Sequence, residues 1–432
     1  MGVRMRLSIG LAVATVVGSV AMSVAPAAAT PKVIVVGPGG VQAALNAAKP
    51  GDTVKLETGV YAEQMIVKSD GVTLDGSGAG PGGSLLNWPA VPLAPGTSCV
   101  VCIGGNADTI RDLKIDLSTS PPNQNTFNPT LGIATVNNPT GTTVEEVTVV
   151  GNGMSASDGI FLAGRNGTVR DTQSSGLFVA IGVTLVGGAV ADNATSGDCL
   201  AIDVIDLAAI GLPAPPGLSS NVTVDGNRVQ GPETCFYAPP PAFYAGGGIS
   251  LNGSPHSTVR DNRISGINDA AIFADAPYDA IVDNTVVDSC LGALVLNDAN
   301  PAQGVDGAAD HDTIRGNEVG GNPAAGCYSV GGGPFSSGIR LDGATKTTAT
   351  GNEIRVSVPT PPASGPVDGL LVETSFANPA ATPLNVRVTA NEVRQTLNGS
   401  PGYDIAWDGT GTSSFHNNDC TSSNPLGLCA AN

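Results

Sequence analysis

Acidic side chains that could exchange a proton with a substrate stand at the ends of short apolar segments of this chain. Asp158 and Asp198 each begin such a segment, and Asp203 follows the segment that Asp198 begins. Catalysis by carboxyl groups needs one group held protonated while another stays ionised, and closely spaced acids achieve this. We therefore predict that, in a hydrolase, Asp198 acts as acid or base with Asp158 and Asp203 as partners.

A second candidate for catalysis is Asp310-His311-Asp312, where a histidine, a residue type that often transfers protons, lies between two carboxylates. His311 precedes Asn317 by six residues, and His256 precedes Asn262 by the same number. Equal spacing makes the two histidines equivalent positions of a repeat. Such positions are typical of structural turns, so a turn role is the alternative prediction.

A third group of acids has the spacing of a metal site. Asp342, Glu373 and Asp408 each follow a corresponding apolar segment of the repeat. In adjacent coils they would stand about 4.8 Å apart, where like charges disfavour ionisation unless a cation lies between them. We predict a surface ladder of acids and weak Ca²⁺ binding by some acidic cluster. The alternative is that the carboxylates splay into water, and no other cofactor is expected.

These residues belong to a pattern that recurs along the chain. An alternating strand leads into a small or Asn-bearing turn and a further strand, as in Val259-Arg260-Asp261-Asn262-Arg263-Ile264 and Ile281-Val282-Asp283-Asn284-Thr285-Val286. Recurrence over tens of residues predicts a solenoid. Asn tolerates left-handed backbone, and stacked Asn side chains can bond along the axis. We therefore assign the turn asparagines a structural role.

The N-terminus predicts export and a capped solenoid. Arg4 and Arg6 precede an apolar run that ends in Ala27-Ala28-Ala29, so residues 1–29 are predicted to be a signal peptide and residues 30–432 the mature domain. An uncleaved membrane anchor is the alternative. Residues 40–48 have an apolar helical face and end at Pro50-Gly51, which predicts a helix that covers the first coil.

Composition restricts the partners. The net charge is −18, and residues 30–432 alone carry −20 because the predicted signal peptide holds two arginines and no acid. Such a surface repels nucleic acid, anionic lipid and uncomplexed acidic polymers, so we expect none of these as a direct partner unless cations bridge, nor a membrane once the signal is cleaved. We expect a secreted monomer.

The eight cysteines predict disulfides in an exported chain. Two pairs occupy equal turn positions of consecutive coils, whose spacing suits a disulfide, and two more pairs are close in sequence. The predicted pairs are Cys199–Cys235, Cys290–Cys327, Cys420–Cys429 and Cys99–Cys102.

Proline-rich segments interrupt the repeat and predict loops that bulge from single coils, where solenoids tend to build a binding face. Several aromatic residues lie in these loops, and we predict that they contact substrate together with Arg340. The alternative is that the rings only cover the undersides of the loops. The aromatic residues are Phe236, Tyr237, Phe243, Tyr244 and Tyr328.

The brief strands from Val54 to Gly76, broken by glycine turns, resemble the opening coils of secreted right-handed parallel β-helix proteins of the pectin lyase-like superfamily. The resemblance covers most of residues 33–420 and implies an all-β fold. The segments at Asp158 and Asp198 also resemble acidic motifs of polygalacturonase-type hydrolases, although the paired aspartates and the histidine of that family are missing. Asp310-His311-Asp312 slightly resembles the Asp-Pro-His-Asp of alginate C5-epimerases, without the Pro. No specific enzyme family is matched.

Two functions remain open. One is an extracellular carbohydrate-active enzyme, a hydrolase, lyase or epimerase that acts on a polysaccharide. The other is a non-catalytic β-helix that binds a glycan or a cell surface. An enzyme should show a convergent set of acids on its groove, whereas a binding protein should show a groove without one.

Overall fold

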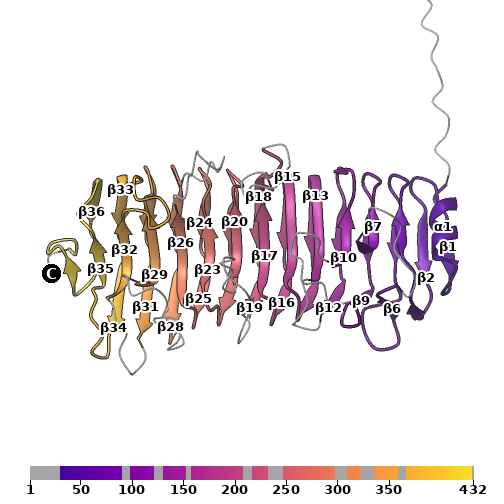
Figure 1. Ribbon diagram of the computed structural model, residues 1–432, viewed down its shortest axis with the longest axis horizontal. Coiled ribbons are helices and arrows are strands. Elements are labelled where there is room, and N and C mark those ends of the chain that lie inside the picture. Colours follow the sequence, from indigo (N-terminus) through magenta and orange to yellow (C-terminus); the bar gives the residue numbers. More distant parts are fainter. Residues whose placement is uncertain are drawn as a thin grey trace, which may run out of the picture. The chain divides into compact units, whose positions relative to one another are not determined.

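The structure, a computed structural model, describes residues 30–89, 98–120, 130–151, 157–207, 217–231, 247–296, 309–322, 335–358 and 366–430. The predicted signal peptide lies outside these residues. Within the unit from Pro31 to Asn432, the chain winds in coils of three strands each, and the strands of successive coils pair in parallel (Figure 1). The predicted all-β parallel solenoid is confirmed.

Each coil contributes one strand to each of three faces. The first face contains β4 (Met65–Val67), β7 (Cys99–Ile103), β10 (Thr130–Thr135), β13 (Ser157–Arg170), β15 (Val179–Ala191), β17 (Leu200–Ile205), β20 (Gly247–Asn252), β23 (Ala270–Ala274), β26 (Leu291–Leu296), β29 (Phe335–Asp342), β32 (Val367–Glu373), β35 (Ile405–Trp407) and β37 (Ser423–Asn424).

The second face contains the later parts of β13 and β15 together with β1 (Val33–Val36), β2 (Thr53–Leu56), β5 (Thr73–Asp75), β8 (Thr109–Arg111), β11 (Thr143–Glu145), β18 (Ser220–Asp225), β21 (Thr258–Arg260), β24 (Ala280–Val282), β27 (Thr313–Arg315), β30 (Thr348–Thr350), β33 (Leu384–Thr389) and β36 (Thr412–His416). The third face contains β3 (Gly59–Tyr61), β6 (Ser84–Asn87), β9 (Lys114–Asp116), β12 (Thr148–Val150), β14 (Gln173–Ser175), β16 (Ala194–Ser196), β19 (Arg228–Gln230), β22 (Arg263–Ser265), β25 (Thr285–Val287), β28 (Glu318–Gly321), β31 (Glu353–Ser357) and β34 (Glu392–Thr396).

The core consists of inward rows of aliphatic side chains that stack from coil to coil. Ile160, Ile181, Ile202 and Ile249 are in register on four successive strands of the first face, and each is at most 1% exposed. Removing such a side chain from water contributes about 1.5–3 kcal/mol. Because side chains alternate along a strand, the period of two in the sequence decides which residues form these rows.

The turn between the second and third faces is held by a ladder of buried asparagines. Each member donates its backbone N–H and its Nδ2 to the Oδ1 of the next member, at 2.9–3.1 Å. The members are Asn193, Asn227, Asn262, Asn284, Asn317, Asn352, Asn391 and Asn418. The sequence predicts that these asparagines themselves adopt the left-handed backbone conformation. The left-handed residue is instead the preceding one, such as Asp261 (φ 55°) and Asp283 (φ 54°).

The N-terminal end is covered by the predicted helix, α1 (Val41–Ala47), which buries Val41 and Leu45 and lies beside β1 (Figure 1). β4 is the first strand of its face in the described part of the chain, so the side of β4 away from β7 needs hydrogen-bond partners. Gln42 supplies them, since its Nε2 donates to Ile66 O at 3.1 Å and its Oε1 accepts from Ile66 N at 2.7 Å. Among the described residues, no helix is long and apolar enough to cross a membrane.

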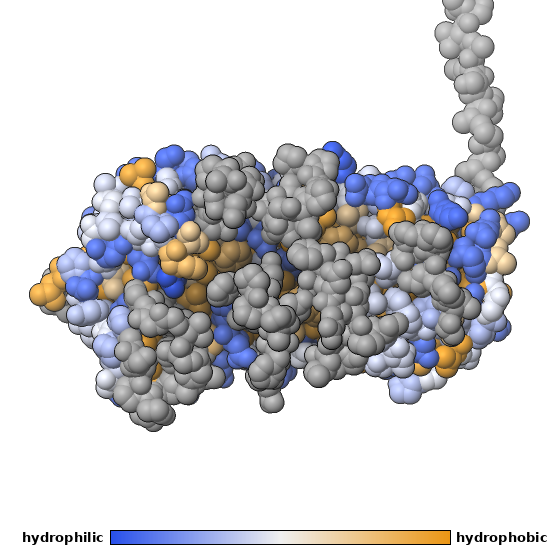
Figure 2. All heavy atoms as spheres, in the orientation of Figure 1, coloured by the Kyte–Doolittle hydropathy of each residue, from blue (hydrophilic) through white to orange (hydrophobic). Residues whose placement is uncertain are grey.

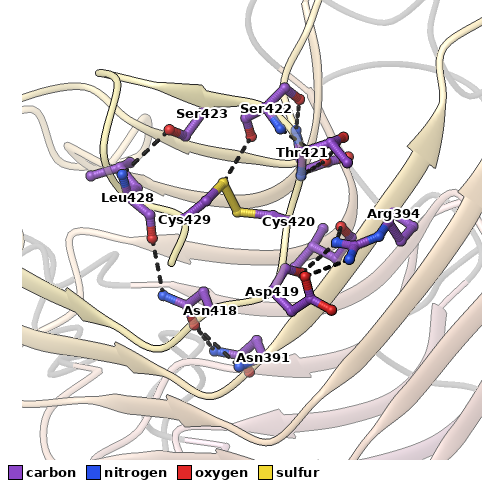
Figure 3. Close-up of a disulfide and its surroundings, with 12 residues drawn as sticks. Asn391, Arg394, Asn418, Asp419, Cys420, Thr421, Ser422, Ser423, Leu428 and Cys429 are labelled. Carbon is purple, nitrogen blue, oxygen red and sulfur yellow. Dashed lines mark hydrogen bonds and ion pairs between the residues drawn. A yellow bond between two sulfur atoms is a disulfide. The ribbon is translucent and has the colours of Figure 1, made fainter. Parts of the chain in front are cut away.

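The C-terminal end is closed by a short disulfide-bonded segment (Figure 3). Cys420 pairs with Cys429, with the Cα atoms 5.3 Å apart, and Asn418 Nδ2 donates to Leu428 O at 3.4 Å. The terminal segment thereby meets the last asparagine of the ladder. Cys99 likewise pairs with Cys102, and both pairs are those that the sequence predicts.

Candidate active site

The predicted catalytic residue Asp158 lies on the outer surface of the first face because the strand is irregular beside it. A Cβ atom at Gly159 would lie 2.8 Å from Leu177 Cδ1 and 2.5 Å from Ala180 O, so Gly159 faces the interior. Ile160 is also a core residue, at 1% exposure. Strict alternation from inward-facing Ile160 would also place Asp158 inside. Because Gly159 and Ile160 both face inward, the alternation is interrupted and Asp158 faces outward.

Asp203 lies on the same outer surface, two coils further along. It is in register with Gly182 of β15, which in turn is in register with Phe161 of β13. A Cβ atom at Gly182 would lie 2.9 Å from the Phe161 ring, so the ring lies over this glycine. An aromatic ring therefore lies between the coil of Asp158 and the coil of Asp203.

Burial perturbs both acids strongly. Asp158 and Asp203 are each 8% exposed, and burial raises the pKa of each carboxyl to about 7. The charge of Asp203 raises the pKa of Asp158 further, while hydrogen bonds from Val179 to Asp158 and from Ser250 to Asp203 oppose the shift. In the described part of the chain, nothing donates a hydrogen bond to Oδ1 of either acid. Buried polar atoms without a partner are uncommon, and perturbed acids cluster at functional sites.

Asp198, the residue that the sequence analysis favoured, has a different environment. It is 2% exposed, its Oδ2 accepts from Ser174 Oγ at 2.9 Å and Ser196 N at 3.2 Å, and its Oδ1 accepts from Leu177 N at 2.8 Å. Burial raises the pKa of Asp198 to about 6. Both oxygens already have partners inside the turn, which is the environment of a structural side chain.

Asp310, His311 and Asp312 do not converge on Asp158 or Asp203, because they lie in the turn between β26 and β27, three coils beyond β17. The His311 ring stacks on Tyr278, and Tyr278 stacks on His256, with ring centroids 4.8 Å apart in both pairs. His311 Nδ1 lies 2.9 Å from Asp310 Oδ2. The three rings occupy the same left-handed turn position in consecutive coils, which is the repeat equivalence that the sequence indicates.

A pair of buried acids, Asp279 and Asp312, had not been expected from the sequence. Each is 2% exposed, and Asp279 N donates to Asp312 Oδ1 at 2.8 Å. Burial and the charge of Asp312 raise the pKa of Asp279 well above its ordinary value, and burial raises the pKa of Asp312 to about 8. Each is the last residue before a second-face strand. This shared position in the repeat could have indicated from the sequence that the two acids are neighbours.

The predicted acid ladder is in register, but only Asp408 is exposed, whereas Asp342 and Glu373 are buried. Asp342 pairs with Glu373 across β29 and β32, and they are 0% and 8% exposed. Arg340 Nη2 lies 2.7 Å from Glu373 Oε1 and 3.3 Å from Asp342 Oδ2, and its guanidinium lies over the Phe376 ring at 4.8 Å. The prediction of an exposed ladder is wrong for Asp342 and Glu373, because an arginine and its surroundings cover them.

The shifts in this cluster follow from burial and Arg340. Burial raises the pKa of Asp342 to about 6 and that of Glu373 to about 7, although Arg340 acts in the opposite direction on both. Burial would also raise the pKa of Asp408, but hydrogen bonds from Thr410 and Thr374 outweigh it and lower that pKa. In the described ranges, no group of three or more His, Cys, Asp or Glu side chains is arranged to hold a metal ion.

Between the two clusters the outer first face is apolar. Phe273 and Leu294 are in register on β23 and β26, and Ala270, Leu291 and Leu296 pack around them. Figure 2 shows hydrophobic surface along the middle of the view, over strands of this face. The first face therefore carries an acid pair, an apolar strip and an arginine–acid cluster along its length.

Several predicted residues cannot be placed. Cys199 and Cys290 are disulfide-bonded, but their predicted partners, Cys235 and Cys327, lie outside the described residues. These two pairings stay predictions. The predicted aromatic contacts also lie outside the described residues, namely Phe236, Tyr237, Phe243, Tyr244 and Tyr328.

Comparison with known proteins agrees with the architecture. The family model described as the right-handed β-helix region matches residues 131–344. No curated protein matches the sequence.

Solved structures share the fold at low sequence identity. A DFA-IIIase from Arthrobacter chlorophenolicus A6 in complex with DFA-III is 11% identical over 86% of this chain and 89% of its own, with a TM-score of 0.54. The Dettilon tailspike protein is 11% identical over 87% of this chain and 63% of its own, with a TM-score of 0.50. The A-module of a mannuronan C-5 epimerase from Azotobacter vinelandii is 17% identical over 89% of this chain and 90% of its own, with a TM-score of 0.48. At these identities the likeness shows the fold alone.

Proposed function

Since this chain is a right-handed parallel β-helix protein, we propose that it is a secreted, carbohydrate-active enzyme whose reaction centre is the Asp158–Asp203 pair. One observation carries the proposal. Two carboxyl groups on the outer first face each have a pKa of about 7 and an oxygen that accepts no hydrogen bond from the described residues. The shared fold of the DFA-IIIase and the tailspike protein supports a carbohydrate as the substrate class.

The pair suits general acid–base chemistry at neutral pH. Because each carboxyl disfavours ionisation of the other, one holds a proton while its partner is ionised. The protonated group can donate to the oxygen that leaves a sugar, and the ionised group can take a proton from water or from the sugar. Both acids are already near the pH at which proton transfer in either direction is efficient.

The spacing of the two strands leaves room for a sugar. β13 and β17 are two coils, or about 9.6 Å, apart, and Asp203 lies a further three residues, or about 10 Å, along the strand, because Asp158 is in register with Leu200 through Val179. Inverting glycosidases place their carboxyl groups about 6.5–9.5 Å apart, so that a water molecule fits beside the sugar. The Phe161 ring over Gly182 would form the floor beneath that sugar. The backbones of Asp158 and Asp203 are further apart than this range, so the pair supports acid–base chemistry on a bound sugar without selecting inversion.

The test is turnover of a panel of neutral and uronate polysaccharides, with measurement of new reducing ends and unsaturated products. In an active preparation, Asp158→Asn and Asp203→Asn should each lower kcat by about 10²-fold or more, with an unchanged melting temperature. The matched control is Asp283→Asn, an exposed left-handed turn residue that Asn can replace, and it should keep full activity. Full activity in both site variants would overturn the proposal, as would the absence of turnover on every polysaccharide.

A second candidate function, glycan binding without catalysis, is favoured by the apolar strip. Phe273 is partly exposed between the two polar clusters, its neighbour Leu294 is 8% exposed, and Phe376 is 60% exposed beside Arg340. Apolar surface with a few polar groups is typical of ligand sites. Saturable binding of a polysaccharide that is never converted would establish this function.

A further inference from the structure

Two arginines lie side by side on the third face without an acidic partner. Arg228 of β19 is directly in register with Arg263 of β22, and both are exposed. Neither forms an ion pair with another described residue. Like charges directly opposite each other in a sheet are destabilising. Repulsion between Arg228 and Arg263 therefore destabilises the folded protein, and no acidic side chain among the described residues compensates for it.

Elsewhere the chain offsets its charges in register. On the second face, Asp75 lies 2.8 Å from Lys55 and 3.1 Å from Arg111, which stand on either side of it. On the third face itself, Glu353 and Glu392 are in register, and Arg355 lies 2.9 Å and 2.8 Å from them. With a net charge of −18 the chain has no shortage of acids. Arg165 and Arg387 likewise form no ion pair with a described residue, but Arg228 and Arg263 also lie directly opposite each other.

A shallow cavity adjoins the arginine pair. Its volume is about 230 Å³, and Arg228 and Gln230 form one side of it. Ala194 lies in register between Gln173 and Arg228, and its short side chain leaves the depression. The other lining residues are neutral, and Thr148, Gln173, Ser175 and Ser196 carry polar side chains, whereas the side chains of Ser174 and Thr195 are buried. We call this cavity, together with Arg263, the β19 hollow (β16 and β19 are labelled in Figure 1).

We propose that the β19 hollow binds a carboxylate-bearing sugar unit of an acidic polysaccharide. The planar guanidinium groups of Arg228 and Arg263 match a carboxylate in shape and charge. Gln173 and Gln230 offer amide groups, and Ser196 a hydroxyl, for the sugar hydroxyls. A bound carboxylate would remove the repulsion between the two arginines, and relief of this repulsion would contribute to the free energy of binding.

The overall charge selects among anionic polymers. A nucleic acid duplex carries one negative charge per about 1.7 Å of its length. The net charge of −18 on the protein would therefore repel it strongly. A uronate chain carries only one carboxylate on each sugar ring, so a local pair of arginines can hold it. In the row of residues that are in register with Arg263, the first acidic side chain is Glu318, two coils further along. Its charge would repel a longer anionic ligand, so the β19 hollow can bind only a few sugar units.

The inference rests on the proposed function only for the choice of a polysaccharide. The hollow is on the third face, whereas Asp158 and Asp203 are on the first, so binding here is separate from turnover there. Binding without turnover would leave this site standing while the proposed enzyme fails.

The experiment is calorimetric titration of the mature chain with a short galacturonic acid oligosaccharide. Arg228→Gln with Arg263→Gln should weaken the dissociation constant by about tenfold or more, and added salt should weaken binding to the wild type. The control is Arg260→Gln, in the same coil, whose arginine is paired with Asp225 on the second face at 2.6 Å. It should bind as the wild type does. The double variant should melt at the same temperature or higher, since a repulsion is removed.

Further ligands decide the chemistry. The fully methyl-esterified oligosaccharide should bind at least about tenfold more weakly, because its carboxylates are neutral. Unchanged binding in the double variant, or equal binding of the ester, would overturn the site. Inorganic sulfate that binds as tightly as the oligosaccharide would reject a saccharide ligand, and tighter binding of a single-stranded oligonucleotide would reject it in favour of nucleic acid.

Discussion

Asn262 donates both its backbone N–H and its Nδ2 to the Oδ1 of Asn284, at 3.0 Å and 2.9 Å, although the two residues are 22 positions apart in sequence. One side-chain oxygen thus satisfies two buried donors of the preceding coil. The same arrangement recurs along the ladder, so each turn is fixed by the next one.

Asn284→Ala should therefore be costly. The change leaves the backbone N–H of Asn262 without an acceptor and removes one of the acceptors of its Nδ2, which keeps Val224 O, and a buried group left unpaired costs about 1–3 kcal/mol. We expect unfolding to become easier by about 3 kcal/mol, measured by urea denaturation. Asn46→Ala, at an exposed position of α1, should change stability by less than about 0.5 kcal/mol. Equal effects of the two changes would show that the ladder contributes nothing.

The stability of the protein should rise as the pH falls from about 8 to about 5. Asp158 and Asp203 have pKa values of about 7 and Asp312 of about 8, all above those of an unfolded chain. In that interval the native state binds more protons than the unfolded state, so raising the pH favours unfolding. Urea midpoints at pH 5, 6.5 and 8 test this, and a midpoint that increases with pH would contradict it. Asp312→Asn, which cannot ionise, should flatten the dependence above pH 6.

Asp198→Ala tests the structural role of that side chain. Ser174, Leu177 and Ser196 would each lose a buried acceptor, so we expect a loss of several kcal/mol in the free energy of unfolding. Turnover per folded molecule should stay unchanged. A rate loss of 10²-fold in a fully folded variant would instead return Asp198 to the chemistry, as the sequence first indicated.

Arg340→Gln should destabilise the protein in a pH-dependent manner. Without the arginine, ionised Glu373 and Asp342 are buried as two uncompensated charges, which costs about 3–5 kcal/mol at pH 8. At pH 5 both acids are protonated, since their pKa values are about 7 and about 6, and the loss should be much smaller. The exposed Arg315→Gln serves as control and should have little effect at either pH. An equal loss at both pH values would assign Arg340 a packing role instead.

Calcium binding is a prediction that the melting temperature can test. Arg340 already occupies the position of the counter-ion between Asp342 and Glu373, so we do not expect Ca²⁺ there. If another acidic cluster binds the ion, millimolar Ca²⁺ should raise the melting temperature relative to chelator, because a ligand of the native state stabilises it. Identical melting curves would rule out a stabilising role for calcium.

The sequence was sufficient to predict the coils and their inward rows of side chains, but not which side chains lie on the outer surface. Rows such as Ile202 and Ile249 follow from a period of two, which any correctly aligned repeat reveals. The outward position of Asp158 does not, because it depends on the irregular backbone at Gly159, which alternation does not encode. The burial of Asp342 was not predicted because it depends on Phe376 of the next coil, whose backbone N–H donates to Asp342 and whose ring lies under the Arg340 guanidinium.

The fixed asparagine turns also determine where the chain can change in length. Successive ladder members are separated by 22, 27, 33, 34, 35 or 39 residues, yet the asparagine contact is the same. The additional residues enter beside the ends of the first-face strands, around β20, β26, β29 and β32. Evolution can therefore lengthen, shorten or replace these segments of the sequence coil by coil, while the described strands keep their register.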